Sequence, residues 1–310
     1  MKLRVGKGRP RLGLALGGGG LRGAAHIGVL KAMERVGIMP DFVAGTSAGS
    51  IVSALYACGY SGEDMERVVM SARASDVLDY EVSFCHLFRM TVKALLDFLD
   101  IPSSWMPPAP MGFIKGNRLE SWIHELTNGK TFEETRIPVA IIALDIDTGN
   151  EIVFGSRPTL SALAELYPRA LLAEGEPLSV AVRASTAIPV VFRPRKYKGM
   201  NLIDGGVINN VPADALRKMG ADVVVAVDLE LANHRPTRID NVLELVVQTI
   251  DVMGQAIADL KLQKHADVVI RPGVYDASLT DFHRIPEFIK MGEQAAEAAM
   301  GEIKSLLSGR

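Results

Sequence analysis

The sequence predicts an α/β fold in which helices cover both faces of a mostly parallel sheet. Short apolar runs of strand length alternate with segments of helical period along almost the whole chain. The runs are apolar at successive positions, so both faces of each strand are expected to be buried. No linker rich in glycine, serine or charge divides the chain, and no repeat is visible. We therefore expect a single domain over residues 1–310.

Each element follows from this pattern in chain order. The expected strands cover residues 12–16, 42–44, 139–144, 152–154, 190–192, 223–227 and 268–270. The expected helices cover residues 21–36, 48–58, 63–72, 118–126, 179–184, 213–219, 242–264 and 285–307. These elements place the core at about residues 11–272 and a C-terminal helix at about residues 285–307.

Composition limits the classes of protein to which the chain can belong. Hydrophobic residues make up 48% and charged residues 23%, which is enough apolar material for a substantial core. The net charge of −2 gives nucleic-acid binding no electrostatic support. The two cysteines, Cys58 and Cys85, lie in apolar settings and are expected to be buried, reduced thiols. Cysteine usage of this kind is typical of a cytoplasmic protein.

The sequence contains no predicted membrane span. The basic N-terminus leads into a short apolar run at residues 12–16, which is better interpreted as a strand than as a signal peptide. No segment approaches the ~18 apolar residues that a spanning helix needs. Residues 75–113 are unusually rich in Phe, Leu, Met and Pro. This segment either covers the sheet or forms an apolar wall beside the active site, so peripheral contact with a membrane stays open.

A glycine run follows the first expected strand in the stretch RLGLALGGGGLRG. Gly18, Gly20 and Gly23 fit the spacing of a dinucleotide-binding loop, but the acidic residue expected after the second strand is missing, since Asp41 precedes that strand. The backbone N–H groups of Gly18, Gly19 and Gly20 could instead form an oxyanion hole at the start of a helix. A simple tight turn is the third interpretation.

Ser47 occupies the junction between an expected strand and an expected helix. Gly45 and Gly49 flank it in the pattern G-x-S-x-G. Small residues at these positions allow the strained turn on which nucleophilic serines are presented. The alternative is that Ser47 merely caps the following helix.

A nucleophilic serine needs a base, and the histidines are poorly placed to provide it. His234, in the stretch LANHRPTR, is the only plausible third member of a triad; the other downstream histidines are His86, His124, His265 and His283. Asp204 is a second candidate, because it ends a short apolar segment and is followed by two glycines. Desolvation would raise its basicity above that of an ordinary aspartate. From the local sequence alone, an Asp–Gly turn competes with this role.

Four motifs together resemble the patatin-like phospholipase family, especially its bacterial single-domain members. The block G-G-G-x-[RK]-G matches residues 18–23, and G-x-S-x-G matches residues 45–49. The block A-S-x-x-x-P matches residues 184–189, and D-G-[GA] matches residues 204–206. All four stand in the family's order, and none departs from the pattern.

The resemblance implies a three-layer α/β/α variant of the serine hydrolase folds and a calcium-independent lipid acyl hydrolase. It makes Ser47 the nucleophile and Asp204 the general base of a dyad, with no histidine, cofactor or metal ion. The oxyanion hole would consist of Gly18, Gly19 and Gly20, with Arg22 nearby. A lipid or other acyl ester is the implied substrate. A regulatory protein-binding module, with its partner unknown, and an acyltransferase are the alternatives.

Other charged residues have two interpretations each. The stretch RPRKYKG at residues 193–199 forms either a solvated hairpin or a contact for an anionic head group. Arg183 makes either a structural ion pair or a contact with a substrate phosphate. Asp145 and Asp147 lack the further acidic ligands of a calcium loop, so a turn between two strands is expected.

Overall fold

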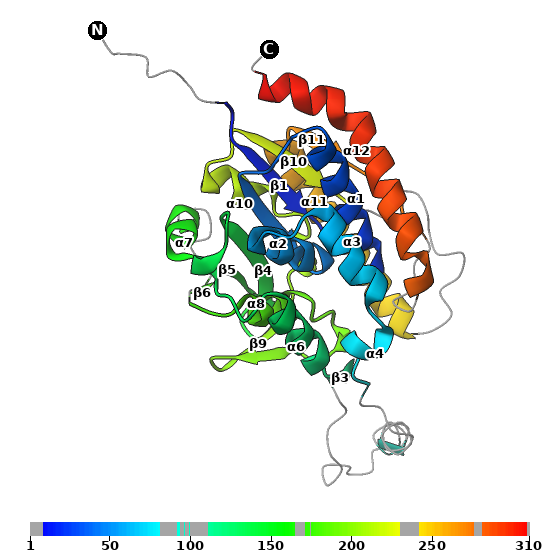
Figure 1. Ribbon diagram of the computed structural model, residues 1–310. Helices are drawn as coiled ribbons and strands as arrows, with labels where there is room; N and C mark the ends of the chain where they lie inside the picture. Colours follow the sequence, from blue (N-terminus) through cyan, green and yellow to red (C-terminus); the bar gives the residue numbers. More distant parts are fainter. Residues whose placement is uncertain are drawn as a thin grey trace.

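The central element of the structure is a twisted sheet with helices on both sides (Figure 1). The computed structural model describes residues 9–80, 92–93, 96, 99, 111–164, 171–173, 175–229, 242–275 and 281–308. The strand order is β11-β10-β1-β2-β4-β5-β6. These strands are β11 (Val268–Ile270), β10 (Val223–Val227), β1 (Leu12–Leu16), β2 (Phe42–Thr46), β4 (Val139–Asp145), β5 (Asn150–Gly155) and β6 (Leu171–Ala173). The five strands from β11 to β4 are parallel, and β5 is antiparallel to β4.

Helices cover both faces of this sheet, which confirms the predicted fold class. The longer helices are α1 (Ala24–Arg35), α2 (Ala48–Cys58), α3 (Gly62–Ser71), α6 (Asn117–Leu126), α8 (Leu178–Ser185), α10 (Ala213–Met219), α11 (Val242–His265) and α12 (Ile285–Leu307). Every helix expected from the sequence is among them. The other helices among the described residues, none longer than α10, are α4 (Ala74–Val77), α7 (Arg157–Leu163) and α9 (Gly206–Asn209), with 3-10 turns at Gly20–Gly23, Phe132–Glu134 and Phe282–Arg284.

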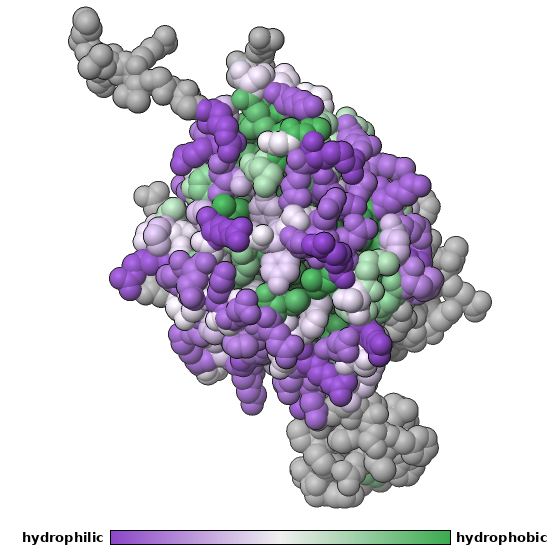
Figure 2. Space-filling model, viewed as in Figure 1, coloured by the Kyte–Doolittle hydropathy of each residue, from purple (hydrophilic) through white to green (hydrophobic). Residues whose placement is uncertain are grey.

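Successive side chains along each strand pack alternately into two separate hydrophobic cores, one on each face of the sheet. In β1, Leu14 packs into a core with α1, α2 and α12, whereas Ala15 packs into a core with α7 and α10. Val225 and Val224 of β10 divide in the same way. Burial of both faces explains why these strands are apolar at every position. The outward surface over α3 and α12 is mostly hydrophilic, because their apolar sides face inward (Figure 2).

One expected strand lies outside the main sheet. β7 (Val190–Phe192) pairs with β3 (Gly112–Ile114) in a small two-stranded sheet. The basic stretch at residues 193–199 forms the predicted hairpin, in which β8 (Arg195–Tyr197) pairs with β9 (Met200–Asp204). Asp145 ends β4 and Asp147 lies in the turn that leads to β5, so the predicted turn between two strands is present.

Two strands share one edge of β4 end to end. β2 runs parallel to β4 as far as the pair Thr46–Ile142. β9 runs antiparallel to β4 and ends at the pair Asp204–Ala143, one position further along. The C-terminal ends of β2 and β9 therefore meet above consecutive residues of β4.

The C-terminal helix α12 lies alongside α1 through a contact between backbones (Figure 1). A Cβ atom at Gly292 would lie 1.9 Å from the carbonyl oxygen of Ala25, and one at Gly28 would lie 1.9 Å from that of Ile289. Contacts this short cannot exist, so both positions require glycine for the helices to approach so closely.

Several predicted features lie outside the described residues. They include Cys85, His86, His234 and most of the apolar segment at residues 75–113. Cys58 is a free, buried thiol, and burial raises its pKa. Within the described ranges, no helix is long and apolar enough to cross a membrane.

We predict that Gly292→Ala destabilises the protein by about 1–3 kcal/mol, because the added methyl group pushes α12 away from α1. Gly301→Ala in the same helix is the matched control, since nothing lies within 4 Å of its added Cβ. That control should be neutral or gain roughly 0.5–1 kcal/mol from helix propensity. Urea unfolding of both variants measures the difference. Equal stability of the two variants would contradict the close contact.

Candidate active site

Ser47 lies at a strained turn between β2 and α2. Its backbone has φ 52° and ψ −124°, a conformation that residues with a side chain rarely adopt. A Cβ at Gly45 would lie 2.3 Å from the carbonyl oxygen of Gly49, and one at Gly49 would lie 2.0 Å from that of Leu16. The G-x-S-x-G pattern thus lets α2 fold back closely over the ends of β1 and β2. No side-chain capping bond joins Ser47 to α2.

The turn is fixed by Ser185, near the end of α8. The Ser47 N–H donates to the Ser185 hydroxyl oxygen at 2.9 Å, and that hydroxyl donates to the carbonyl of Ile142 in β4 at 2.6 Å. On the other side, the Thr46 hydroxyl donates to the carbonyl of Asn209 at 2.8 Å. The A-S-x-x-x-P motif therefore contributes a bridge between the serine turn and the central strand.

Asp204 ends β9 directly opposite this turn. Ser47 and Asp204 are each only 5% exposed, and the two side chains lie close enough for the Ser47 hydroxyl to lower the pKa of the Asp204 carboxyl. The Gly206 N–H also donates to the Asp204 carboxylate at 2.8 Å. A Cβ at Gly205 would lie 2.6 Å from the carbonyl oxygen of Ile142, so the first glycine of the D-G-G motif lets this turn pack on β4.

Burial dominates the electrostatics of Asp204. Desolvation raises its pKa to about 7, against the opposing effects of the Ser47 hydroxyl and the Gly206 N–H. The negative charge of Asp251, on α11, raises it further. A carboxyl group with such a pKa exchanges protons near neutral pH, as a general base requires.

The glycine run lies beside the serine. A Cβ at Gly18 would lie 3.0 Å from the Cβ of Ser47. The Gly18 N–H already donates to Asn210, 3.0 Å from the side-chain oxygen and 3.3 Å from the backbone carbonyl oxygen. Within the described residues, the N–H groups of Gly19 and Gly20 have no acceptor. These two donors are therefore available to an acceptor.

Arg22 and His26 fix the glycine run through hydrogen bonds with its carbonyl groups. Arg22 donates to the carbonyls of Gly19 at 3.1 Å and Leu229 at 3.2 Å. His26 is fully buried, lies 2.8 Å from the carbonyl oxygen of Gly17, and has its pKa lowered by burial to about 4. It is therefore neutral and donates its Nε2 proton to that carbonyl.

Three residues of this site were not singled out in the sequence: Ser185, Asn210 and His26. Ser185 and Asn210 lie within or just after motifs, but only the fold reveals which loop each contacts. His26 precedes Ser47 in the chain, where the order of a conventional triad gives no reason to look. Within the described residues, no histidine bonds to Ser47 or Asp204, and no group of three His, Cys, Asp or Glu side chains could hold a metal ion.

The patatin-like phospholipase model matches residues 14–217, which is more than half of the chain. This chain belongs to that family. The matched range includes all four motifs and both Ser47 and Asp204. The family assignment confirms the resemblance predicted from the sequence.

Curated relatives extend this comparison. An uncharacterized NTE family protein of Mycobacterium tuberculosis is 29% identical over 76% of the chain and 54% of its own length, so the chain spans about half of that relative. The uncharacterized protein YqhO of Bacillus subtilis is 29% identical over 90% of the chain and 94% of its own length. A lysophospholipase of Aspergillus fumigatus, nte1, is 32% identical over 70% of the chain but only 12% of its own length.

A solved structure supports the fold of this patatin-like chain. VipD from Legionella pneumophila aligns with a TM-score of 0.50 at 15% identity, covering 98% of this chain and 67% of VipD. At that identity the likeness concerns the fold alone.

We predict that Ser185→Ala lowers stability by about 1–3 kcal/mol, because it removes the acceptor of the buried Ser47 N–H and the hydroxyl that donates to the Ile142 carbonyl. Ser53→Ala in α2 is the matched control, since the Ser53 hydroxyl is equally buried but has no hydrogen-bond partner. The control should be neutral or slightly stabilised. Thermal unfolding compares the two variants, and equal losses would argue against the bridge.

Proposed function

We propose that this chain is a serine-dependent lipid acyl hydrolase that acts through a Ser47–Asp204 dyad. The observation that carries the proposal is that Ser47, at a strained turn, lies within interaction range of the buried Asp204 carboxyl, whose pKa is raised to about 7. Membership of the patatin-like phospholipase family and similarity to a lysophospholipase support a lipid ester as substrate.

The reaction proceeds in two steps. The Ser47 oxygen attacks the ester carbonyl carbon while Asp204 accepts the hydroxyl proton. Collapse of the tetrahedral intermediate breaks the bond to the alcohol, which leaves with the proton from Asp204. Water then attacks the acyl-enzyme, Asp204 accepts a proton from it, and the carboxylic acid departs as Ser47 is restored.

The oxyanion of each intermediate is assigned to the N–H groups of Gly19 and Gly20. Both are unused within the described residues, and both belong to the run that packs against Ser47. The Gly18 N–H serves the hole only if it leaves Asn210. Arg22 positions the run through the Gly19 carbonyl.

We predict that a fluorophosphonate probe labels Ser47. The wild type should be labelled, and Ser47→Ala should not, because the probe reacts with a serine that a neighbouring carboxylate activates, here Asp204. Hydrolysis of p-nitrophenyl esters and phospholipids should disappear in the same variant. Labelling that persists in Ser47→Ala would reject the assignment.

The Asp204→Asn variant should fold normally, and its kcat should fall by about 10²–10⁴-fold, because the amide cannot accept the proton of the Ser47 hydroxyl. In the wild type, kcat/KM should rise with pH through one ionisation near 7, since only the unprotonated carboxylate acts as base. Asp147→Asn, an exposed carboxyl at the β4–β5 turn, is the control and should keep both rate and profile. Rates measured from acid to alkaline pH test the assignment. A nearly active Asp204→Asn protein would leave His234 as the candidate base.

A further inference from the structure

A second polar cavity lies on the opposite side of α8 from the serine. It has a volume of about 720 Å³ and is bordered by α6, α8 and the segment leading into β8. Arg183, which lines it, and Ser185, which contacts Ser47, are about 200° apart around the helix. The cavity is therefore separate from the candidate active site.

Cations dominate the lining of this cavity. They are Lys115, Arg183, Arg193, Arg195 and Lys196, against two carboxylates, Glu120 and Glu125. Arg195 forms a bidentate ion pair with Glu120, in which both N–O distances are 2.8 Å. Among the lining residues, cations outnumber carboxylates by five to two, which would favour an anionic ligand.

Arg183 is the most unusual member of this lining, because it is a guanidinium with only 2% of its surface exposed. Its Nη2 donates to the carbonyls of Lys115 at 2.6 Å and Arg193 at 2.7 Å. Its Nη1 has no hydrogen-bond partner, and no described carboxylate forms an ion pair with it. Glu120 and Asp79 favour its charge only from beyond ion-pair distance, so a buried guanidinium with an unpaired Nη1 would gain from binding an anion.

The surroundings of Arg183 keep the guanidinium in place. Its Cζ lies 5.5 Å from the centre of the Phe192 ring. A Cβ at Gly116, which has φ 79°, would lie 2.1 Å from the Nε of Arg183, so only glycine leaves room for the side chain. The expected structural ion pair of Arg183 is therefore wrong: carbonyl oxygens and an aromatic ring hold it instead.

We propose that this cavity is a non-catalytic site for a phosphoryl anion, with Arg183 as its central ligand. A guanidinium fixed in one plane matches the oxygen geometry of phosphate, and the neighbouring cations supply the additional charge. The anion could be free phosphate or the phosphate of a lipid head group.

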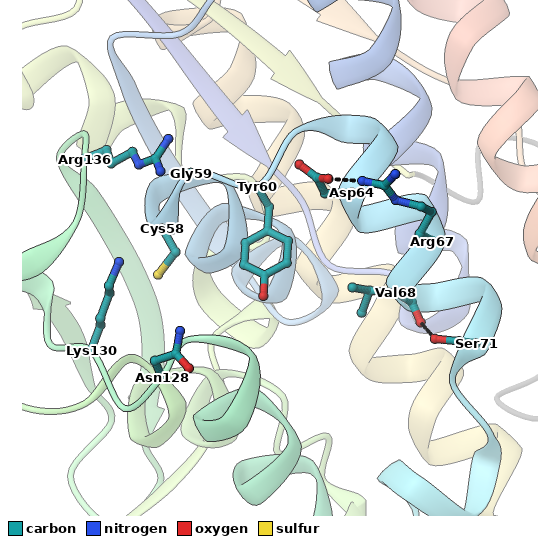
Figure 3. A pocket seen from close by; sticks show the side chains of 10 residues that line it. All are labelled: Cys58, Gly59, Tyr60, Asp64, Arg67, Val68, Ser71, Asn128, Lys130 and Arg136. Atoms are coloured by element: carbon teal, nitrogen blue, oxygen red, sulfur yellow. Dashed lines mark hydrogen bonds and ion pairs between the residues drawn. The ribbon is translucent and has the colours of Figure 1, made fainter.

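Thermal unfolding in a Ser47→Ala background tests the site independently of hydrolysis. Sodium phosphate should raise Tm by about 2–5 °C over sodium chloride of equal ionic strength. Adding Arg183→Gln should abolish the rise. Arg136→Gln is the matched control, because Arg136 lines another cavity and likewise packs over a glycine with positive φ, Gly59 (Figure 3). The Arg136→Gln control should keep the full phosphate-dependent rise in Tm.

Sedimentation with phosphatidylcholine vesicles, with and without phosphatidic acid, identifies the source of the anion. Binding to phosphatidic acid that depends on Arg183 assigns the site to a lipid head group. Stabilisation by phosphate without such binding assigns it to a soluble phosphate. No rise in Tm, or a rise that survives Arg183→Gln, would overturn the proposal.

A second variant serves if circular dichroism shows that Arg183→Gln does not fold. Lys196 is exposed, so Lys196→Glu should leave the fold intact. It should weaken phosphate binding by about two- to fivefold, the scale of a single exposed charge. Unchanged affinity in that variant would also overturn the proposal.

Discussion

The shared edge of β4 is the constraint on which the rest of the site depends. β2 and β9 approach from opposite directions and end at Ile142 and Ala143, which are consecutive residues. Ser47 directly follows β2 and Asp204 is the last residue of β9, so their side chains are brought close together. The Ser185 hydroxyl donates to the carbonyl of Ile142, and Gly205 packs on the same carbonyl. The neighbours of both Ser47 and Asp204 are therefore positioned by one peptide group of β4.

This arrangement carries an electrostatic cost. Burial raises the pKa of Asp204 from 3.8 to about 7, so its ionisation opposes folding increasingly as the pH rises through that range. His26 has the opposite effect, because burial lowers its pKa from 6.5 to about 4. Its contribution to stability is lost as the pH falls through that window. Asp204 therefore penalises folding at neutral and higher pH, and His26 penalises it in acid.

Much of the fold could be predicted from the sequence, because its strands are buried on both faces and its helices are amphipathic. Residues 223–227 and 268–270 were predicted with their observed bounds. A hairpin at residues 193–199 was one of two interpretations, but the bounds of β8 could not be predicted, since a short charged strand has no apolar pattern. A three-residue run could not reveal that β7 leaves the main sheet. Ser47 and Asp204 could be selected as candidates from motifs. Their supports could not, because Ser185, Asn210 and His26 act through contacts between distant segments.

The position of β9 also has a consequence for how the protein matures. About half of the chain separates Ser47 from Asp204, and their meeting depends on the non-local pairing of β4 with β9. Such pairings form late, because the entropy of closing a long loop must be offset first. While β9 has not yet emerged from the ribosome, the nascent chain contains the Ser47 turn but lacks the Asp204 carboxylate. The two halves of the site thus become joined only when synthesis is well past the midpoint.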